Sequence, residues 1–75
     1  MNDQIVIDPE VLHGKPVIRG TRVPVARVVD GMAGGMTEQE LCSDYDITID
    51  DVRAALAFAA QLVEAESFHP LPETN

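Results

Sequence analysis

Apolar residues recur at helical spacing near the middle of the chain. They stand at positions i, i+3, i+4 and i+7, which places them on one face of an α-helix. This stripe consists of Val25, Val28, Val29 and Met32. Pro24 suits the first turn of such a helix, where its missing N–H costs no hydrogen bond. Gly34 and Gly35 follow the stripe, and glycine freely takes the left-handed conformation that closes a helix. The pattern predicts a first helix between Pro24 and the glycine pair.

Two short segments carry the signature of a helix start. In MTEQEL, Thr37 is placed to cap a helix and Glu40 to reach back from the third position. ITIDDV repeats the scheme with Thr48 and Asp51. In both segments an apolar residue before the cap can pack onto one in the first turn. These pairs are Met36 with Leu41 and Ile47 with Val52.

The spacing of the two starts predicts how the last two helices are connected. The second helix must end near Tyr45 and the third begins near Ile49. A turn of about three or four residues between two helices is typical of a helix-turn-helix. The third helix is expected to continue to about Glu66, and the prolines of SFHPLPETN indicate an irregular tail over residues 67–75.

Two β-prone runs precede the helices. Ile5–Ile7 and Val17–Ile18 are separated by PEVLHGK, a segment with turn chemistry, so the runs are expected to pair as a small ribbon. The predicted fold class is therefore mainly α, with a three-helix helix-turn-helix domain after a short two-stranded β-segment. We expect a single domain over residues 1–75, with the β-segment and a basic loop in 1–22 and the helices in 24–66.

The third helix is apolar on nearly all sides. Ten of the twelve residues from 52 to 63 are apolar. The expected core face is Val52, Leu56, Ala59 and Val63. The opposite face is Ala54, Ala57, Phe58, Gln61 and Ala65. A helix of this kind is usually buried on both sides. Another subunit or protein is expected to cover the second face, although an alanine-rich face can also tolerate water.

The composition indicates a small protein of a reducing compartment. A chain of 75 residues buries only about 60% of its unfolded surface, so a partner chain would help its core. Cys42 stands alone and is expected to be a small buried hydrophobe. The N-terminus does not read as a signal peptide and no segment is long enough to span a membrane. We therefore expect a cytoplasmic protein with no membrane partner.

Positive charge is concentrated in one segment. The net charge is -8, yet four of the five Lys and Arg residues lie within GKPVIRGTRVPVAR. Residues 1–27 sum to +1 (four basic, three acidic) and residues 28–75 to -9 (one basic, ten acidic). An acidic chain favours basic partners and repels nucleic acid at long range. The basic segment therefore requires its own explanation.

Three interpretations of the basic segment compete. In these interpretations, its arginines pair with the acidic start of the third helix, contact DNA phosphates, or enter an acidic pocket of a partner. The candidate DNA contacts are Lys15, Arg19, Thr21, Arg22, Arg27 and Arg53. A recognition helix presents its first residues to the groove, and here these include Asp50 and Asp51. Any DNA binding would therefore be weak and strongly salt-dependent.

Catalytic chemistry is not indicated. Asp44, Asp46, Thr48 and Asp50 alternate as at the start of a calcium loop. The loop would need glycine where Ile49 stands and a closing Glu where Ala55 stands. No Ser, Cys or His lies in a recognisable nucleophile setting, and a small helical surface offers little pocket. We expect no enzyme, no metal site and no cofactor.

With these residues in view, the chain resembles a bacterial family, the domain of unknown function 433. The resemblance covers residues 5 to about 63. Its most specific elements are GKPVIRGTRVPV and DITIDDVRAALAFAA. The resemblance implies a homeodomain-like three-helix fold and the role of antitoxin in a type II toxin–antitoxin pair, similar to VapB-type proteins. It also implies a PIN-like ribonuclease toxin as partner, with promoter DNA and a homodimer as further expectations.

The resemblance offers a role for the arginines. PIN-like nucleases gather carboxylates to hold divalent metal, and an antitoxin can block such a site with arginine or with apolar surface. We expect Arg19 and Arg22 to do so. Many VapB-type antitoxins wrap the toxin with a long C-terminal segment, whereas nine residues follow the third helix here. The folded domain itself is thus expected to make the toxin or dimer contact, through Ala54, Ala57, Phe58 and Gln61. The alternatives are a stand-alone helix-turn-helix regulator and an interaction module that does not bind DNA.

Overall fold

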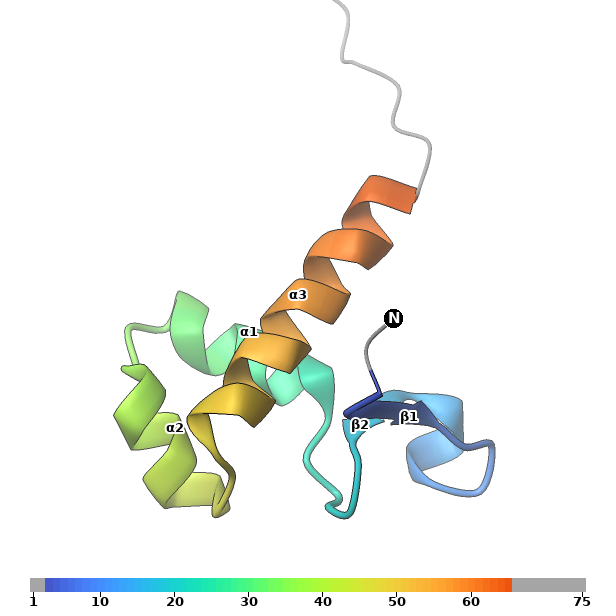
Figure 1. Cartoon of the computed structure of the whole chain (residues 1–75), viewed down its shortest axis with the longest axis horizontal. Helices are drawn as coiled ribbons and strands as arrows, with labels where there is room; N and C mark the ends of the chain where they lie inside the picture. The colour runs from blue at the N-terminus through green and yellow to red at the C-terminus, as the bar shows by residue number, and fades with distance from the viewer. Residues whose placement is uncertain (1–2, 66–75) are drawn as a thin grey trace, which may run out of the picture.

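A two-stranded antiparallel sheet is followed by three helices (Figure 1). The computed structural model describes residues 3–65. The elements are β1 (Ile5–Ile7), a short 3-10 turn (Leu12–Gly14), β2 (Pro16–Ile18), α1 (Val25–Ala33), α2 (Glu38–Tyr45) and α3 (Ile49–Ala65). The predicted fold class is confirmed. The predicted tail, residues 67–75, lies outside the described residues.

The ribbon joins the core through its second strand. Ile5 pairs with Ile18, Val6 with Val17 and Ile7 with Pro16. Val17 and Ile18 are buried, whereas Ile7 is 58% exposed. A two-stranded ribbon is marginal alone and must pack against another element. Here β2 does so, because its last residue belongs to the helical core.

The connection between the strands is a left-handed turn. Leu12, His13 and Gly14 have φ angles of 50°, 58° and 83°. Only glycine takes this conformation without cost, so the other two residues are strained. Backbone hydrogen bonds hold the turn, from Gly14 N to Val11 O at 3.0 Å and from Lys15 N to Leu12 O at 3.2 Å. The turn ends at Lys15, directly before β2.

The first helix matches its pattern except at the ends. Val25 and Val28 are buried, while Val29 and Met32 are half-buried against the core. Pro24 lies just before the helix instead of in its first turn, because it is extended (φ -72°, ψ 149°) and bridges to Val17. At the other end Gly35, with φ 100°, is the left-handed residue, and Gly34 is not.

Both predicted capping boxes are present. The Glu40 backbone N donates to Thr37 Oγ1 at 3.0 Å, and Thr37 N donates to Glu40 Oε1 at 2.8 Å. The same pair of bonds links Thr48 and Asp51, at 3.0 and 3.1 Å. Residues 46–48 form the turn between α2 and α3. These bonds satisfy backbone donors that the first turn of a helix leaves free.

The core draws one fully buried large side chain from each of four elements. These side chains are Ile18 of β2, Val28 of α1, Leu41 of α2 and Val52 of α3. They belong to one cluster. The chain is therefore held together at a single point where the sheet and all three helices meet.

The expected faces of α3 are partly wrong. Val63, predicted in the core, is 56% exposed, and Ala54, predicted on the uncovered face, is 9% exposed. Phe58 is half-buried against the core. The reason lies in the position of the core, which covers only the first turns of α3, while the last turns extend beyond the other two helices (Figure 1). Ala57, Gln61 and Ala65 are exposed, as expected. Within residues 3–65 no helix is long and apolar enough to cross a membrane.

Gly31 tests how tightly α1 and α2 pack. A Cβ atom at Gly31 would lie 2.7 Å from Leu41 Cδ2 and 3.2 Å from Met36 Sδ. In an open helix position Gly→Ala stabilises by about 1 kcal/mol. Here we expect Gly31→Ala to lower the free energy of unfolding by about 1–3 kcal/mol, because overpacking dominates. Urea unfolding followed by circular dichroism measures it.

The matched control removes the clashing atom. Leu41→Val lacks the δ-methyl group, so the effect of Gly31→Ala should shrink in that background. The difference between the two backgrounds gives the coupling of the pair. A Gly31→Ala protein that is more stable than wild type would contradict the close approach.

Candidate interaction surfaces

The basic turn, residues 19–22 between β2 and α1, presents two exposed arginines. The side chain of Thr21 stabilises this turn by local hydrogen bonds. Its hydroxyl donates to Ile18 O at 2.7 Å and accepts from Val23 N at 3.0 Å. Gly20 takes a positive φ of 78°. Arg19 and Arg22 therefore project from a loop whose backbone is fixed by local bonds. The hydroxyl of Thr21 is used in the turn, and its contact with DNA stays a prediction.

The arginines of the basic segment are not tied to the acidic start of α3. Arg19 Nε donates to the backbone O of Asp3 at 2.7 Å. Arg22 and Arg27 are exposed and form no ion pair with any residue from 3 to 65. The interpretation in which these arginines hold the domain together by pairing with α3 is thus wrong for the described residues. Their charge is available to a partner.

Arg53 occupies a different setting. Its Nε atom lies 3.6 Å from Glu38 Oε2, and the side chain is 68% exposed. This pair links α3 to α2. Exposed pairs of this kind contribute about 0–1 kcal/mol. Lys15 precedes β2 and the basic turn follows it, so the six predicted DNA contacts are spread over several elements.

The acidic start of α3 has a structural task. Asp51 Oδ2 accepts from Thr48 N, and Asp51 Oδ1 accepts from the side-chain amide of Gln4 at 2.9 Å. The carboxylate of Asp51 thus caps α3 and also connects this helix to Gln4, the residue directly before β1. Asp50, its neighbour, is exposed. The negative charge that opposes DNA phosphates at this helix end is accordingly part of the fold.

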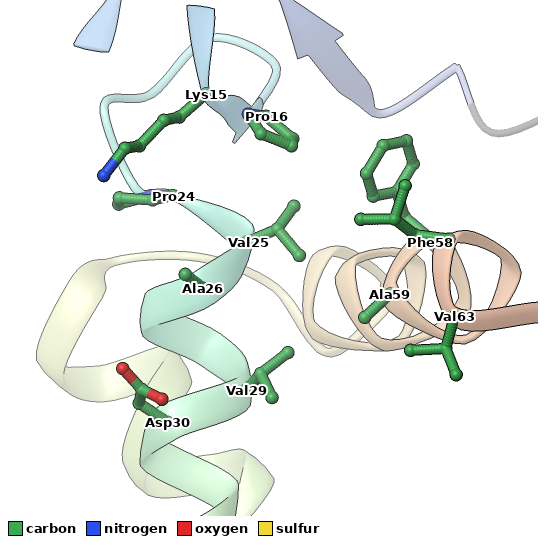
Figure 2. Close-up of a pocket in the computed structure, with 11 residues that line it drawn as sticks. Lys15, Pro16, Pro24, Val25, Ala26, Val29, Asp30, Phe58, Ala59 and Val63 are labelled. Atoms are coloured by element: carbon green, nitrogen blue, oxygen red, sulfur yellow. The ribbon is translucent and has the colours of Figure 1, made fainter. Parts of the chain in front are cut away.

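A groove lies between α1 and the second half of α3, and we refer to it as the α1–α3 groove. Its volume is about 380 Å³. The lining residues are Lys15, Pro16, Pro24, Val25, Ala26, Val29, Asp30, Phe58, Ala59, Leu62 and Val63. Figure 2 shows Val25 and Val29 pointing from α1 toward the α3 residues. Nine of the eleven lining residues are apolar. Only Lys15 and Asp30 carry charge.

The groove and the predicted interface share one residue, and the role of the predicted face stays a prediction. Phe58 is the one member of the predicted set Ala54, Ala57, Phe58 and Gln61 that lines it. Ala54 is buried, and Ala57 and Gln61 are exposed outside the lining. The contribution of α1, of Pro16 at the start of β2 and of Pro24 before α1 was missed. The sequence did offer one signal. Val29 lies at the edge of the apolar stripe of α1, and an apolar side chain at the edge of a stripe is only partly buried in the core.

Comparison with known proteins places these features in a family. Residues 5–59 match the family described as "Protein of unknown function (DUF433)". A crystal structure of a DUF433 member from Anabaena variabilis superposes with a TM-score of 0.76 at 35% identity, covering 81% of this chain and 61% of that one. The crystal structure of Rv2018 from Mycobacterium tuberculosis gives a TM-score of 0.64 at 40% identity, covering 69% of this chain and 24% of that one.

A curated relative carries a functional name. A Mycobacterium tuberculosis protein named "Putative antitoxin VapB45" is 40% identical over 52 residues, which is 69% of this chain. The chain spans 22% of the length of that relative. The likeness therefore concerns this small domain of the relative.

The two neighbouring aspartates of α3 allow a matched test. Both stand in the first turn and interact similarly with the helix dipole, but only Asp51 accepts the bonds from Thr48 and Gln4. We expect Asp51→Ala to lower the free energy of unfolding by about 1–3 kcal/mol more than Asp50→Ala. Urea unfolding of the two variants measures the difference. Equal losses would show that the bonds of Asp51 contribute nothing beyond its charge.

Proposed function

We propose that this chain, which belongs to the DUF433 family, is the antitoxin of a toxin–antitoxin pair. In this role it binds a PIN-like ribonuclease toxin directly and represses its own promoter as a homodimer. The observation that carries the proposal is the 40% identity, over 69% of this chain, with the protein named "Putative antitoxin VapB45". The role is one of binding and requires no catalytic residue.

The basic turn supports the toxin contact. A nuclease that holds metal with clustered carboxylates offers an acidic pocket, and the planar guanidinium fork of arginine matches a carboxylate in two parallel hydrogen bonds. Arg22 has no ion-pair partner within residues 3–65, and Arg19 uses Nε for the Asp3 carbonyl. The bonds of Thr21 fix the loop between them. Because the loop is already ordered, binding costs little backbone conformational entropy.

Promoter binding involves the helices as well as the basic turn. The turn of residues 46–48 gives α2 and α3 the connection of a helix-turn-helix. The start of α3, however, carries Asp50 and Asp51, which face phosphates unfavourably. We propose that the basic turn and Arg27 supply the phosphate contacts, twice in a dimer, with a steep dependence on salt. A stand-alone regulator without a toxin is the alternative that these contacts favour.

Co-expression with the product of the neighbouring gene tests the antitoxin role. With a tag on this chain alone, we expect a small nuclease-like protein to co-purify at a fixed stoichiometry. That protein should arrest growth when it is expressed without the antitoxin. A chain that purifies alone beside a harmless neighbour would contradict the role and favour the regulator.

Charge reversal tests the basic turn. We expect Arg19→Glu with Arg22→Glu to abolish toxin neutralisation, because reversing a charge that is desolvated in an interface costs about 2–5 kcal/mol or more. The free energy of unfolding should change by about 1 kcal/mol or less, since both side chains are exposed and only one hydrogen bond is lost. Growth rescue and isothermal titration with the toxin give the two readouts.

The control for charge reversal keeps the net charge equal. Arg27→Glu with Arg53→Glu changes the chain by the same four units but leaves the basic turn intact. This pair should retain neutralisation. If both double variants lose the toxin equally, general electrostatics and not the basic turn explains binding.

A further inference from the structure

We infer that the α1–α3 groove is the surface through which two copies of this chain pair. The inference rests on the homodimer of the proposed function and assigns it an interface. The lining of the groove includes none of residues 19–22, so the proposed interface and the basic turn consist of different residues.

The end of α3 requires a cover that the described chain does not provide. Leu62 and Val63 are 51% and 56% exposed. They line the same hollow as the half-buried Phe58. Scattered apolar residues on a surface are normal, but a contiguous apolar patch around a cavity marks an interaction site. The exposed Leu62 and Val63 thus lie directly beside the α1–α3 groove of the same chain.

This adjacency suits a second copy as the occupant. In a two-fold dimer the same patch serves both partners, so each must offer both a projecting part and a receiving part. The last turns of α3 project beyond the other helices (Figure 1). The groove beside them can receive the projecting turns of the second copy. Pairing two such faces therefore covers Leu62 and Val63 of each copy at once.

The two charges of the groove are arranged for the same symmetry. Lys15 lies close to Pro24 at one end of the α1 side of the groove, and Asp30 lies at the other end, on the side of α1 that faces away from α3 (Figure 2). A two-fold axis that crosses the groove between these ends exchanges them. Lys15 of each copy then faces Asp30 of the other. One basic and one acidic group on an otherwise apolar lining give a self-complementary surface.

Most of the acidic residues lie away from this pairing, while Glu64 is exposed next to Val63 on the last turns of α3, outside the lining. A chain of net charge -8 repels its own copy unless the contact avoids the acidic residues. Among residues 3–65, Asp30 is the one acidic residue that lines the groove. The exposed acidic groups of α2, of the turn after it and of the start of α3 lie outside the lining. They include Glu40, Asp44, Asp46 and Asp50.

A charge swap on the full chain tests the pairing of Lys15 with Asp30. Each single reversal, Lys15→Glu or Asp30→Lys, places like charges together twice in the dimer. We expect either variant alone to dimerise about tenfold or more weakly than wild type, as like charges oppose association. Sedimentation equilibrium measures this. When the two variants are mixed, every contact of the mixed pair joins opposite charges, so a heterodimer of near wild-type strength should form.

The mixture separates the inference from its rivals. A pairing of Lys15 with Asp30 inside one chain cannot produce a heterodimer from two dissociated variants. Recovery on mixing would therefore support the proposed interface. Variants that keep the wild-type dimer, or a mixture that stays monomeric, would overturn it, as would a wild-type chain that is monomeric at all concentrations.

The apolar part has its own matched pair. Leu62→Ser removes a side chain of the groove, whereas Ala57→Ser changes an exposed residue of α3 outside it. We expect Leu62→Ser to weaken dimerisation and Ala57→Ser to leave it unchanged. The reverse order would place the dimer on the face that includes Ala57. Neither result affects co-purification with the toxin, so a failure here is distinct from a failure of the antitoxin role.

Discussion

The structure depends on one crowded contact between its elements. Ile18, Val28, Leu41 and Val52 come from four elements and are fully buried together. Gly31 lets α2 approach α1 at this point, since a Cβ atom there would meet Leu41 at 2.7 Å. A chain of this size has apolar side chains for one such cluster. The last turns of α3 extend beyond this cluster, so Leu62 and Val63 remain exposed. They line the α1–α3 groove.

Local hydrogen bonds then fix the segments that present charge. Thr21 holds the basic turn, and Asp51 joins the start of α3 to Gln4 near β1. The turn and the helix end have opposite charge, yet in the described chain they are not paired with each other. This separation leaves Arg22 available to an external carboxylate. Because Asp51 in the first turn of α3 accepts bonds from Gln4 and Thr48, its negative charge serves the fold, and this charge is unfavourable in a DNA groove.

Two surfaces result, with different chemistry. The basic turn offers guanidinium groups on a fixed loop, which suits an acidic partner. The groove offers apolar side chains with one charge of each sign, which suits a copy of itself. The two surfaces share no residue, although Pro24 of the groove follows the basic turn closely in sequence. An antitoxin that dimerises and binds a toxin simultaneously needs such a division.

The sequence by itself determined every feature that depends on neighbours within a few residues. The capping boxes at Thr37 and Thr48, the stripe of α1 and the pairing of the two β-runs were predicted correctly, because each arises from short-range bonding or periodicity. The family and its antitoxin likeness also followed from local motifs. Sequence patterns of this kind are independent of how the elements are arranged in space.

Only the tertiary structure decided which face of α3 is covered and how far along. Periodicity assigned Val63 to the core and Ala54 to the surface, yet Ala54 is buried and Val63 is exposed. Val63 is exposed because the helix leaves the core before its last turns. The groove gathers residues from Lys15 to Val63. The partners of the arginines were likewise undetermined, since an ion pair depends on side chains distant in sequence. Burial and charge pairing arise from packing, and packing is set by the crossing of elements in three dimensions.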